Sequence, residues 1–234
     1  MQFTIEDPPL PSFARWRAMS RVAPGQSILR ALQYEKFSSL KISGRVLDFG
    51  GGRRASYIRW LKDADVVSVN IDAQFDPTHI VEPGTSLPFH EGEFDAVVTL
   101  NTLEHVYDDI AALRELSRVT RPGGALHIMV PFLFRVHGHP DDFNRHTPSW
   151  WARALEEAGY AQARLVPLIF GRRTAAQLVA GRGGRAIRGL TGGIAASIDI
   201  LSARLSFPAQ DSYIGRKGEK VWSQSPGWYI HAVR

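Results

Sequence analysis

The sequence predicts an α/β fold in which helices cover both faces of a mostly parallel sheet. Two observations indicate this fold. Between residue 44 and about residue 170, short apolar runs that suit buried strands alternate with longer segments of helical periodicity. The first of these strands also passes directly into three glycines, as strands do in nucleotide-binding α/β folds. Because strands joined through a crossover helix run parallel, the alternation predicts a doubly wound sheet.

The N-terminal 43 residues are expected to form a helical cap. Between residues 12 and 40, apolar side chains recur at helical spacing, and Pro24-Gly25 interrupts them. This pattern predicts one or two helices that cover the sheet or a bound cofactor.

The core is expected over residues 44–170, and residues 171–234 complete the same domain. Seven strands are predicted, at residues 46–49, 66–71, 80–81, 94–100, 125–130, 161–169 and 227–233. Helices are predicted at 55–61, 108–119 and 149–158, the last with Thr147 as N-cap and Pro148 in its first turn. Residues 171–207 form a helical insertion before the final edge strand, near the substrate end of the sheet or at a homodimer contact.

The absence of cysteine limits the chemistry of the chain. None of its 234 residues is a cysteine, so disulfides, Cys-ligated zinc and thiol nucleophiles are excluded. The first residues lack the features of a signal peptide, and no apolar run approaches the roughly 20 residues that span a bilayer. We therefore expect a cytoplasmic protein.

The net charge of +5 is unevenly distributed. Between Arg164 and Arg188 there are six arginines and no acidic residue. A solvated helical surface is one interpretation, and a surface that attracts phosphate, sugar nucleotide, nucleic acid or anionic lipid is the other. Aromatic residues do not interleave with these arginines as they would on a single-strand binding platform, so nucleic acid is the less favoured partner.

Two motifs indicate a nucleotide-like ligand. The run Val46–Gly52 carries Asp48 before Gly50, Gly51 and Gly52, and glycines at a strand end let a ligand approach the backbone. Asp72 ends the next predicted strand, where a carboxylate can accept both hydroxyls of a ribose. The two motifs together are more specific than either alone.

The later segments give the chain a family resemblance. After Val46–Gly52 and Asp72 come, in order, Leu87-Pro88-Phe89, Phe94–Val97, Leu103–Val106, and Arg118-Val119 with Arg121–Gly124. From about residue 44 to residue 160, the chain resembles the class I S-adenosylmethionine-dependent methyltransferases, in the broad group that acts on small molecules. The resemblance implies a Rossmann-like, seven-stranded fold and S-adenosylmethionine as cofactor.

The resemblance also implies roles for individual residues. Asp48 and the turn Gly50–Gly52 would hold the methionine part, Asp72 the ribose hydroxyls, and Ala73 would lie against adenine. Leu87 would form an apolar wall of the adenine site, and Asn101, Thr102 and Leu103 would line the cofactor near its sulfonium. Two positions depart from the family pattern: Arg54 stands where another glycine is common, and Glu82 lies early for a contact with the adenine amino group.

The segment 131–147 follows the fifth strand, where the substrate opening is expected. Its polar residues are His137, His139, Asp141, Asp142, Arg145 and His146. Three interpretations compete: His137 or His139 is a general base with Arg145 or Asp142 positioning substrate; Asp142, Arg145 and Thr147 brace the loop and cap the next helix; or the histidines and aspartates bind a metal. No recognised zinc spacing is present, so no metal is assigned. His105 is a further candidate base, or caps a helix.

These observations predict a methyltransferase for a small-molecule or saccharide-like acceptor, which the basic residues would suit if it is anionic. Oxygen methylation is slightly favoured. Without cysteine, covalent attack on a pyrimidine is excluded, and no Asn-Pro-Pro-aromatic motif for exocyclic amino groups is present. The alternatives are an RNA or protein methyltransferase that uses the basic segment 164–188, and a cofactor-binding interaction protein without catalysis.

Overall fold

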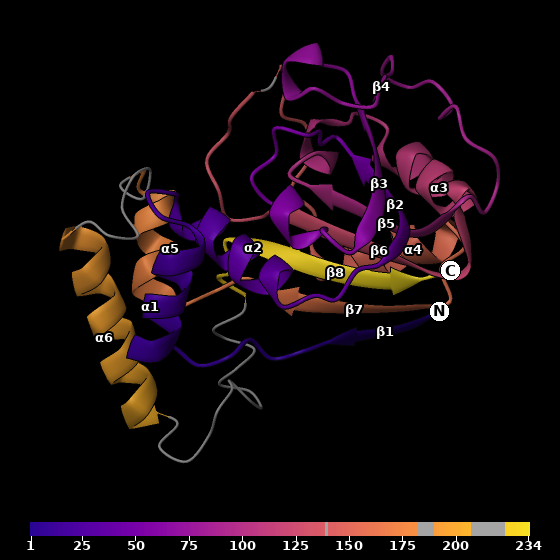
Figure 1. Cartoon of the computed structure of the whole chain (residues 1–234). Coiled ribbons are helices and arrows are strands. Elements are labelled where there is room, and N and C mark those ends of the chain that lie inside the picture. Colours follow the sequence, from indigo (N-terminus) through magenta and orange to yellow (C-terminus); the bar gives the residue numbers. More distant parts are fainter. Residues whose placement is uncertain (139, 182–189, 207–222) are drawn as a thin grey trace.

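The computed structural model describes residues 1–138, 140–181, 190–206 and 223–234. Its centre is an eight-stranded sheet in the order β1-β7-β8-β6-β5-β2-β3-β4. The strands are β1 (Gln2–Ile5), β2 (Gly44–Phe49), β3 (Ala64–Asn70), β4 (His79–Ile80), β5 (Phe94–Leu100), β6 (Thr120–Pro131), β7 (Gln162–Pro167) and β8 (Gly227–Val233). Only β8 runs antiparallel to its neighbours, so the sheet is mostly parallel as expected (Figure 1). The expectation that β8 is an edge strand is wrong, because it pairs with β6 on one side and β7 on the other.

The expected count of seven strands is one too few, because the N-terminus contributes β1. Gln2–Ile5 pairs in parallel with β7 at the edge of the sheet. The terminal amino group of Met1 also forms an ion pair of 2.8 Å with Glu156. An edge strand of four residues with mostly exposed side chains lacks the apolar run that reveals a buried strand. The N-terminal region is therefore a strand followed by the two expected helices.

Two separate cores lie on the two faces of the sheet. Successive side chains of a strand point to opposite faces, so Val46 packs in one core and Leu47 in the other. The first core is covered by α1 (Phe13–Val22), α2 (Ile28–Ser38), α5 (Arg172–Val179) and α6 (Leu190–Ser206). The second is covered by α3 (Asp109–Val119) and α4 (Pro148–Glu157).

The helix predicted at 55–61 is wrong. This stretch holds only a short 3-10 turn, η1 (Ile58–Trp60). The N–H groups of Arg53 and Arg54 donate to the carbonyls of Asp76 and Phe75, which tie the chain to a second 3-10 turn, η2 (Ala73–Phe75). Those bonds turn the backbone away from a regular helical path directly after the glycines.

The other two core helices have the expected ends. The side chain of Asp108 caps α3 by accepting from the N–H of Ala111 at 2.9 Å. Thr147 is the N-cap residue of α4 with Pro148 in the first turn, although its hydroxyl makes no capping bond. Gly159, at φ +89°, follows the end of α4 in a conformation that favours glycine.

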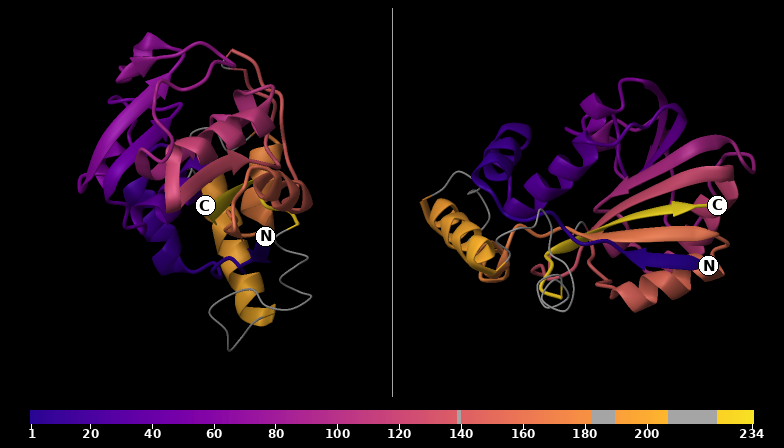
Figure 2. Two further views of the ribbon diagram at one scale, coloured as in Figure 1. Left: turned by 90° about the vertical axis from the view of Figure 1, so that its right-hand side faces the viewer. Right: turned by 90° about the horizontal axis from the view of Figure 1, so that it is seen from below.

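The helices α5 and α6 stand between β7 and β8, within the expected insertion. Together with α1 they lie beyond the end of the sheet that is opposite the two termini (Figures 1 and 2). This is the carboxyl end of the parallel strands, since β6 ends at Pro131 beside Gly227, the first residue of β8. None of the helices in the described ranges has the length and apolar character needed to cross a membrane.

Candidate functional site

The carboxyl ends of four neighbouring strands converge on one edge of the sheet. The chain leaves β2 toward β3 on one side, and β5 lies on the other, so the strand order reverses at β2. Ligands of open α/β sheets bind in the crevice outside such a reversal. The glycine turn follows β2, Asp72 follows β3, Asn101 follows β5, and Phe132–His137 follows β6.

The glycine turn is fixed to the neighbouring strand. Gly50 has φ +85°, and its N–H donates to the carbonyl of Val69 at 2.8 Å. The side-chain amide of Asn70 donates to the carbonyls of Gly50 and Gly51 at 2.8 and 3.0 Å. The turn after β2 and the chain after β3 are therefore held together as one unit.

All three glycines are required by contacts within the protein itself. A Cβ on Gly50 would lie 2.2 Å from the side chain of Thr102, and one on Gly52 would lie 2.2 Å from the carbonyl oxygen of Phe75. A Cβ on Gly51 would collide with the carboxylate of Asp48 and the hydroxyl of Tyr57. Close packing of the protein around the turn thus explains these glycines, in addition to the expected approach of a ligand.

Asp48 is fully buried beneath this turn. Its carboxylate accepts from the hydroxyl of Tyr57 at 2.8 Å and from the N–H of Gly52 at 3.2 Å. Burial raises the pKa of Asp48 to about 7, against the opposing effect of these two hydrogen bonds. Asp48 therefore holds the shape of the turn from inside.

Asp72 lies at the carboxyl edge, next to the glycine turn, with a half-buried side chain. Its Oδ1 accepts from the N–H of Gln74 at 2.8 Å, and its own N–H donates to Asn70 at 3.0 Å. The following residue, Ala73, is exposed. Arg54 donates to the carbonyl of Gln74 at 3.1 Å, so its side chain lies along this loop.

Leu87 and Leu103 are buried in the second core rather than exposed at the edge. The N–H of Leu87 donates to Glu115 at 2.7 Å, which ties the segment between β4 and β5 to α3. Thr102 is half-buried and donates to the carbonyl of Phe49 at 3.2 Å. These three side chains support the edge from below.

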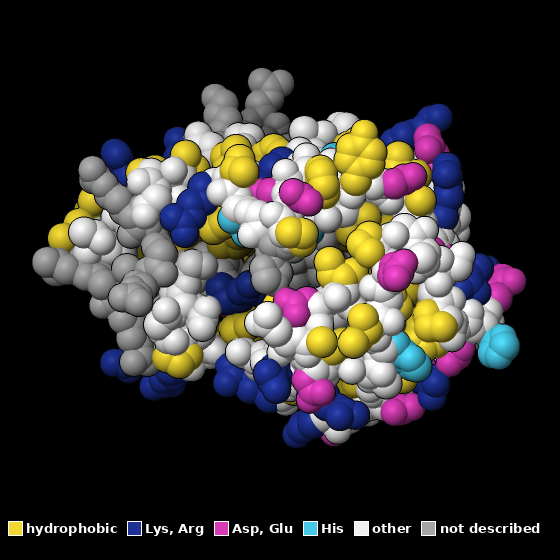
Figure 3. Space-filling view, turned by 90° about the horizontal axis from the view of Figure 1, so that it is seen from above, with side chains coloured by type: hydrophobic (Ala, Val, Ile, Leu, Met, Phe, Trp, Pro, Cys, Tyr) yellow, Lys and Arg dark blue, Asp and Glu magenta, His cyan; other side chains and the backbone are white. Residues whose placement is uncertain are grey.

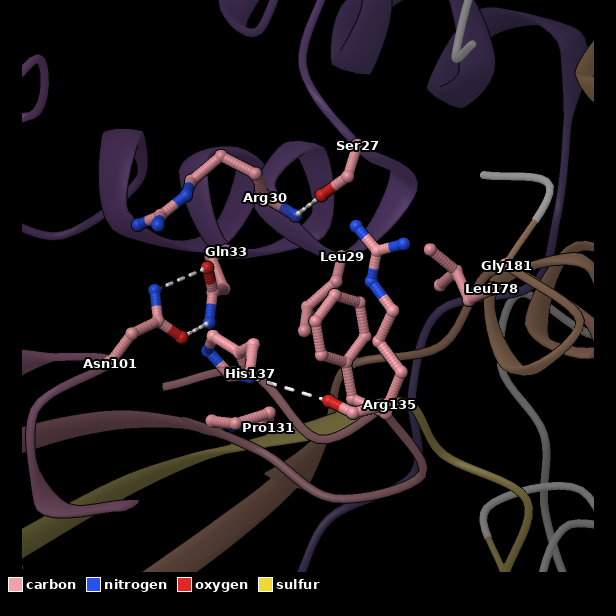
Figure 4. A pocket seen from close by; sticks show the side chains of 11 residues that line it. Ser27, Leu29, Arg30, Gln33, Asn101, Pro131, Arg135, His137, Leu178 and Gly181 are labelled. Atoms are coloured by element: carbon pink, nitrogen blue, oxygen red, sulfur yellow. Dashed lines mark hydrogen bonds between the residues drawn. The ribbon is translucent and has the colours of Figure 1, made fainter. Parts of the chain in front are cut away.

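A cavity of about 250 Å³ opens beside these residues, between α2, the end of β5, the chain after β6 and α5. Its walls combine apolar, amide and cationic side chains: Ser27, Leu29, Arg30, Gln33, Asn101, Pro131, Phe134, Arg135, His137, Leu178 and Gly181. Two expected site residues, Asn101 and His137, therefore meet in one pocket (Figure 4). The cations Arg30 and Arg135 form no ion pair with any carboxylate in the described ranges.

Asn101 connects this pocket to α2. It is one of two non-glycine residues with positive φ in the described part of the chain, at φ +51°, and such backbone strain often marks functional sites. Its side-chain amide and that of buried Gln33 face each other at 2.6 and 3.1 Å (Figure 4). The guanidinium of Arg30 can only donate, so the amide atom of Asn101 that lies 2.7 Å from it is the oxygen.

The sequence did not single out Arg30, Gln33 or Arg135. In the printed sequence, Arg30 and Gln33 lie between the apolar positions of a helix that was expected to cover the sheet or a bound cofactor. The amide of Gln33 is fully buried, which marks Gln33 as a candidate site residue. This burial is evident only from the structure.

The polar segment after β6 is braced by an ion pair. Arg145 contacts both carboxylate oxygens of Asp142, at 2.5 and 2.6 Å, and the same carboxylate accepts from the backbone N–H of His137 at 2.7 Å. Burial acts to raise the pKa of Asp142, but these hydrogen bonds outweigh it and lower the pKa. This geometry supports the bracing interpretation for Asp142 and Arg145, whereas His139 lies outside the described residues.

His137 itself is half-buried at the pocket wall. Burial lowers the pKa of its imidazole, so the neutral form that can accept a proton is favoured. His146 lies elsewhere: its Nε2 is 2.5 Å from Asp109, and its ring stacks on Trp150. His146 therefore joins α3 to α4.

His105 follows β5 at the end of the 3-10 turn η3 (Leu103–His105). Asp108, not His105, caps α3. The preceding residue, Glu104, is 2% exposed, and neither of its carboxylate oxygens has a hydrogen-bond partner in the described part of the chain. Burial raises the pKa of Glu104 to about 8.

The basic segment is described only in part. Arg164, Arg172 and Arg173 lie in described ranges, while the remaining arginines of 164–188 do not. Arg164 is 3.4 Å from Glu6. On the face shown in Figure 3, Lys and Arg side chains are interspersed with acidic and hydrophobic ones.

Comparison with known proteins identifies related sequences and folds. Residues 47–128 match a family model described as a methyltransferase domain. Demethylmenaquinone methyltransferase of Mycolicibacterium vanbaalenii is 39% identical over 95 residues, which are 37% of this chain and 42% of that protein. The corresponding protein of Corynebacterium glutamicum strain R is 33% identical over 97 residues, 38% of this chain and 42% of that protein. The matched region thus spans about two fifths of these relatives.

Solved structures share the fold over most of the chain. Phosphoethanolamine N-methyltransferase 2 of Haemonchus contortus, in complex with S-adenosyl-L-methionine, has a TM-score of 0.54 at 12% identity and covers 94% of this chain and 56% of its own. A possible histamine N-methyltransferase of Thermotoga maritima has a TM-score of 0.53 at 15% identity and covers 94% of each chain. At these identities the likeness concerns the fold.

Proposed function

We propose that this chain, which belongs to the class I S-adenosylmethionine-dependent methyltransferases, transfers a methyl group to a small-molecule acceptor bound in the pocket beside Asn101. The observation that carries the proposal is the position of that pocket. It opens at the strand-order reversal, and Asn101 belongs both to its wall and to the segment expected near the sulfonium.

The residues at the edge suit S-adenosylmethionine. A rigid turn without side chains and an aspartate at the next strand end supply the close backbone approach and the carboxylate that a nucleoside requires. Gly50–Gly52 would hold the methionine part, Asp72 the ribose, and Ala73 the adenine. When bound, the cofactor supplies an electrophilic methyl group, so the protein needs chiefly to orient the acceptor.

The pocket favours an acceptor with an apolar body and an ionisable oxygen. Leu29, Phe134 and Leu178 offer apolar contact, while Arg30 and Arg135 attract a negative charge. A hydroquinone or another aromatic hydroxyl compound has both features. Because relatives of this chain are named demethylmenaquinone methyltransferase, the proposal includes carbon methylation as well as oxygen methylation. Both reactions can start from an aromatic ring whose hydroxyl group is ionised.

His137 is the proposed general base. Its imidazole lies at the pocket wall, is neutral at physiological pH, and is positioned by the braced segment 135–145. A neutral imidazole can remove the acceptor proton as the methyl group is transferred. His139 and His105 were the other candidate bases, and His105 suits a metal ligand better. Arg145 contributes indirectly, because it holds Asp142 in place.

Turnover with a panel of acceptors tests this function. The purified chain is incubated with S-adenosylmethionine and with demethylmenaquinol, simple phenols, catechols and amines, and methylated products are identified by mass spectrometry. We expect methylation of a hydroxylated aromatic acceptor, and we expect His137→Ala to lower kcat about 100-fold or more with little change in cofactor affinity. His90→Ala, at an exposed position, is the control. Turnover of amines alone would contradict the acceptor class.

An RNA or protein acceptor remains the alternative, together with a non-catalytic interaction role. Binding of an RNA through the basic segment would weaken steeply with salt, whereas turnover of a small acceptor would change little. The dimer contact expected at 171–207 and the cytoplasmic location likewise stay predictions, and sedimentation of the purified chain tests the former.

A further inference from the structure

A second group of side chains lies beside the acceptor pocket, and it includes His137, the proposed general base. Glu104, His105 and His137 each offer one oxygen or nitrogen atom, and these three atoms lie within 4.8 Å of one another. Glu104 Oε1 and His105 Nε2 lie 3.8 Å apart. Two of the residues follow β5 and the third follows β6, so adjacent strands of the sheet bring them together.

The Glu104 carboxyl group is buried without a protein partner. Its side chain is 1% exposed, and both oxygens lack a hydrogen bond in the described part of the chain. A buried carboxyl group in this state costs several kcal/mol unless a proton, a water or a cation compensates it. The cavity on its other side measures about 10 Å³, the lower limit for a single water.

The imidazole of His105 is oriented as in a metal-binding histidine. The Nδ1 of His105 lies 2.5 Å from the carbonyl oxygen of Asp141, so Nδ1 carries the proton and Nε2 presents its lone pair toward Glu104. A backbone carbonyl on the far ring nitrogen is the usual support of a metal-binding histidine. The Nδ1 of His137 lies 3.3 Å from both the carbonyl oxygen of Arg135 and the guanidinium of Arg145, so a backbone carbonyl alone does not fix its proton.

Of two nearby cations, Arg145 is compensated by a carboxylate and Arg30, among the described residues, is not. Arg145 lies 3.3 Å from His137 Nδ1, but its guanidinium is paired with both oxygens of Asp142. The guanidinium of Arg30 lies against the amide oxygen of Asn101. Once ionised, the buried carboxylate of Glu104 supplies a negative charge that a divalent ion can use.

We infer that Glu104, His105 and His137 form a binding site for one divalent transition-metal ion, of which Zn²⁺ is the representative. Two imidazoles and one carboxylate are the ligand set of open zinc and iron sites, which keep a position for a further ligand. His137 also lines the acceptor pocket, so an ion held by these residues would lie beside that pocket.

The metal would change how the acceptor is activated. This step rests on the proposed function. An acceptor oxygen bound to the ion would lose its proton more readily, because a divalent cation stabilises the oxyanion. His137 would then act as a ligand, and the proton would pass to solvent or to a free base instead of to its Nε2.

Metal titration of the purified, EDTA-treated chain tests the site. We expect one Zn²⁺ per chain in a competition assay with a chromophoric chelator, and visible absorption bands when Co²⁺ is used. Glu104→Gln, which keeps the shape of the side chain, and His137→Ala should each weaken Zn²⁺ binding at least about 100-fold. His90→Ala removes an exposed histidine from elsewhere and should bind as the wild type does.

Binding of S-adenosylhomocysteine by the same samples separates the two proposals. Unchanged S-adenosylhomocysteine binding in Glu104→Gln would show that the variant is folded and that the metal loss is local. Zn²⁺ bound in the absence of any affinity for S-adenosylhomocysteine would overturn the proposed function and leave the metal site intact. Less than one equivalent of Zn²⁺ on the wild type, or wild-type affinity in Glu104→Gln, would overturn the metal site.

Discussion

Asp48 illustrates how a single side chain fixes the proposed cofactor edge from within. Its carboxyl group receives one hydrogen bond from the turn and one from Tyr57, and no part of it is exposed. The folded protein therefore favours the protonated carboxyl group, whose pKa is about 7, over the carboxylate that the unfolded chain holds above about pH 4.

This difference predicts a dependence of stability on pH. A carboxyl group with a raised pKa in the folded state stabilises the fold fully below the unfolded pKa, and loses that contribution as pH rises through about 7. Between pH 5 and pH 8, the wild type should lose about 2 to 3 kcal/mol more unfolding free energy than Asp48→Asn. Urea denaturation at both pH values measures it, with exposed Asp65→Asn as control. Equal losses in wild type and Asp48→Asn would contradict the burial argument.

For single residues, the sequence predicted which ones lie near the reaction centre better than it predicted which side chains they contact. Asn101 and His137 were expected near the reaction centre, and they meet in one pocket. Glu104 belongs to the Leu103–Val106 motif, but the sequence does not show whether its carboxylate is exposed or buried. Its burial depends on the packing of Phe143 and Asn144, whose N–H groups donate to the Glu104 carbonyl from 39 and 40 positions further along the chain.

At the scale of elements, the insertion is held to itself by one buried carboxylate. Asp199 on α6 accepts from the N–H groups of Arg173 and Thr174 and from the Thr174 hydroxyl, each at 2.9 Å. It thereby caps the N-terminus of α5, where the helix leaves N–H groups without internal partners. Because Leu178 of α5 lines the acceptor pocket, this cap also positions one pocket wall.

Removing the cap should loosen that wall. Asp199→Ala removes the acceptor of the Arg173 and Thr174 N–H groups, while the Thr174 hydroxyl keeps the Gly171 carbonyl. We expect it to destabilise the protein by about 1 to 3 kcal/mol. Asp199→Asn should cost less, since its amide oxygen still accepts. Thermal unfolding measures both, with exposed Ser197→Ala on the same helix as the matched control. A loss in Asp199→Ala no larger than that in Ser197→Ala would mean that α5 and α6 are held by their apolar contacts alone.

Elements were predicted best where burial is complete. The strands at 94–100 and 227–233 have the expected bounds, and most of their side chains are buried inside the sheet. The stretch 55–61 was predicted wrongly because its apolar spacing suits a helix, while hydrogen bonds to Phe75 and Asp76 decide its path. Such long-range bonds leave no local pattern in the sequence.

At the scale of the whole molecule, the sheet order places the two proposed halves of the site together. The cofactor residues follow β2 and β3, the pocket and the metal ligands follow β5 and β6, and these four strands are neighbours around the reversal at β2. The alternation of strands and helices predicted this arrangement. It could not predict that α2 and α5, from the two ends of the chain, would close the pocket.

The proposed methyl transfer requires that Asp72 and the glycine turn bind S-adenosylmethionine. Calorimetry with S-adenosylhomocysteine on the wild type and on Asp72→Ala tests it most directly, with exposed Asp65→Asn as the control. We predict one binding site on the wild type and a loss of affinity of at least about tenfold in Asp72→Ala, because the ribose hydroxyls lose their acceptor. No binding by the wild type, or equal binding by Asp72→Ala, would contradict the account.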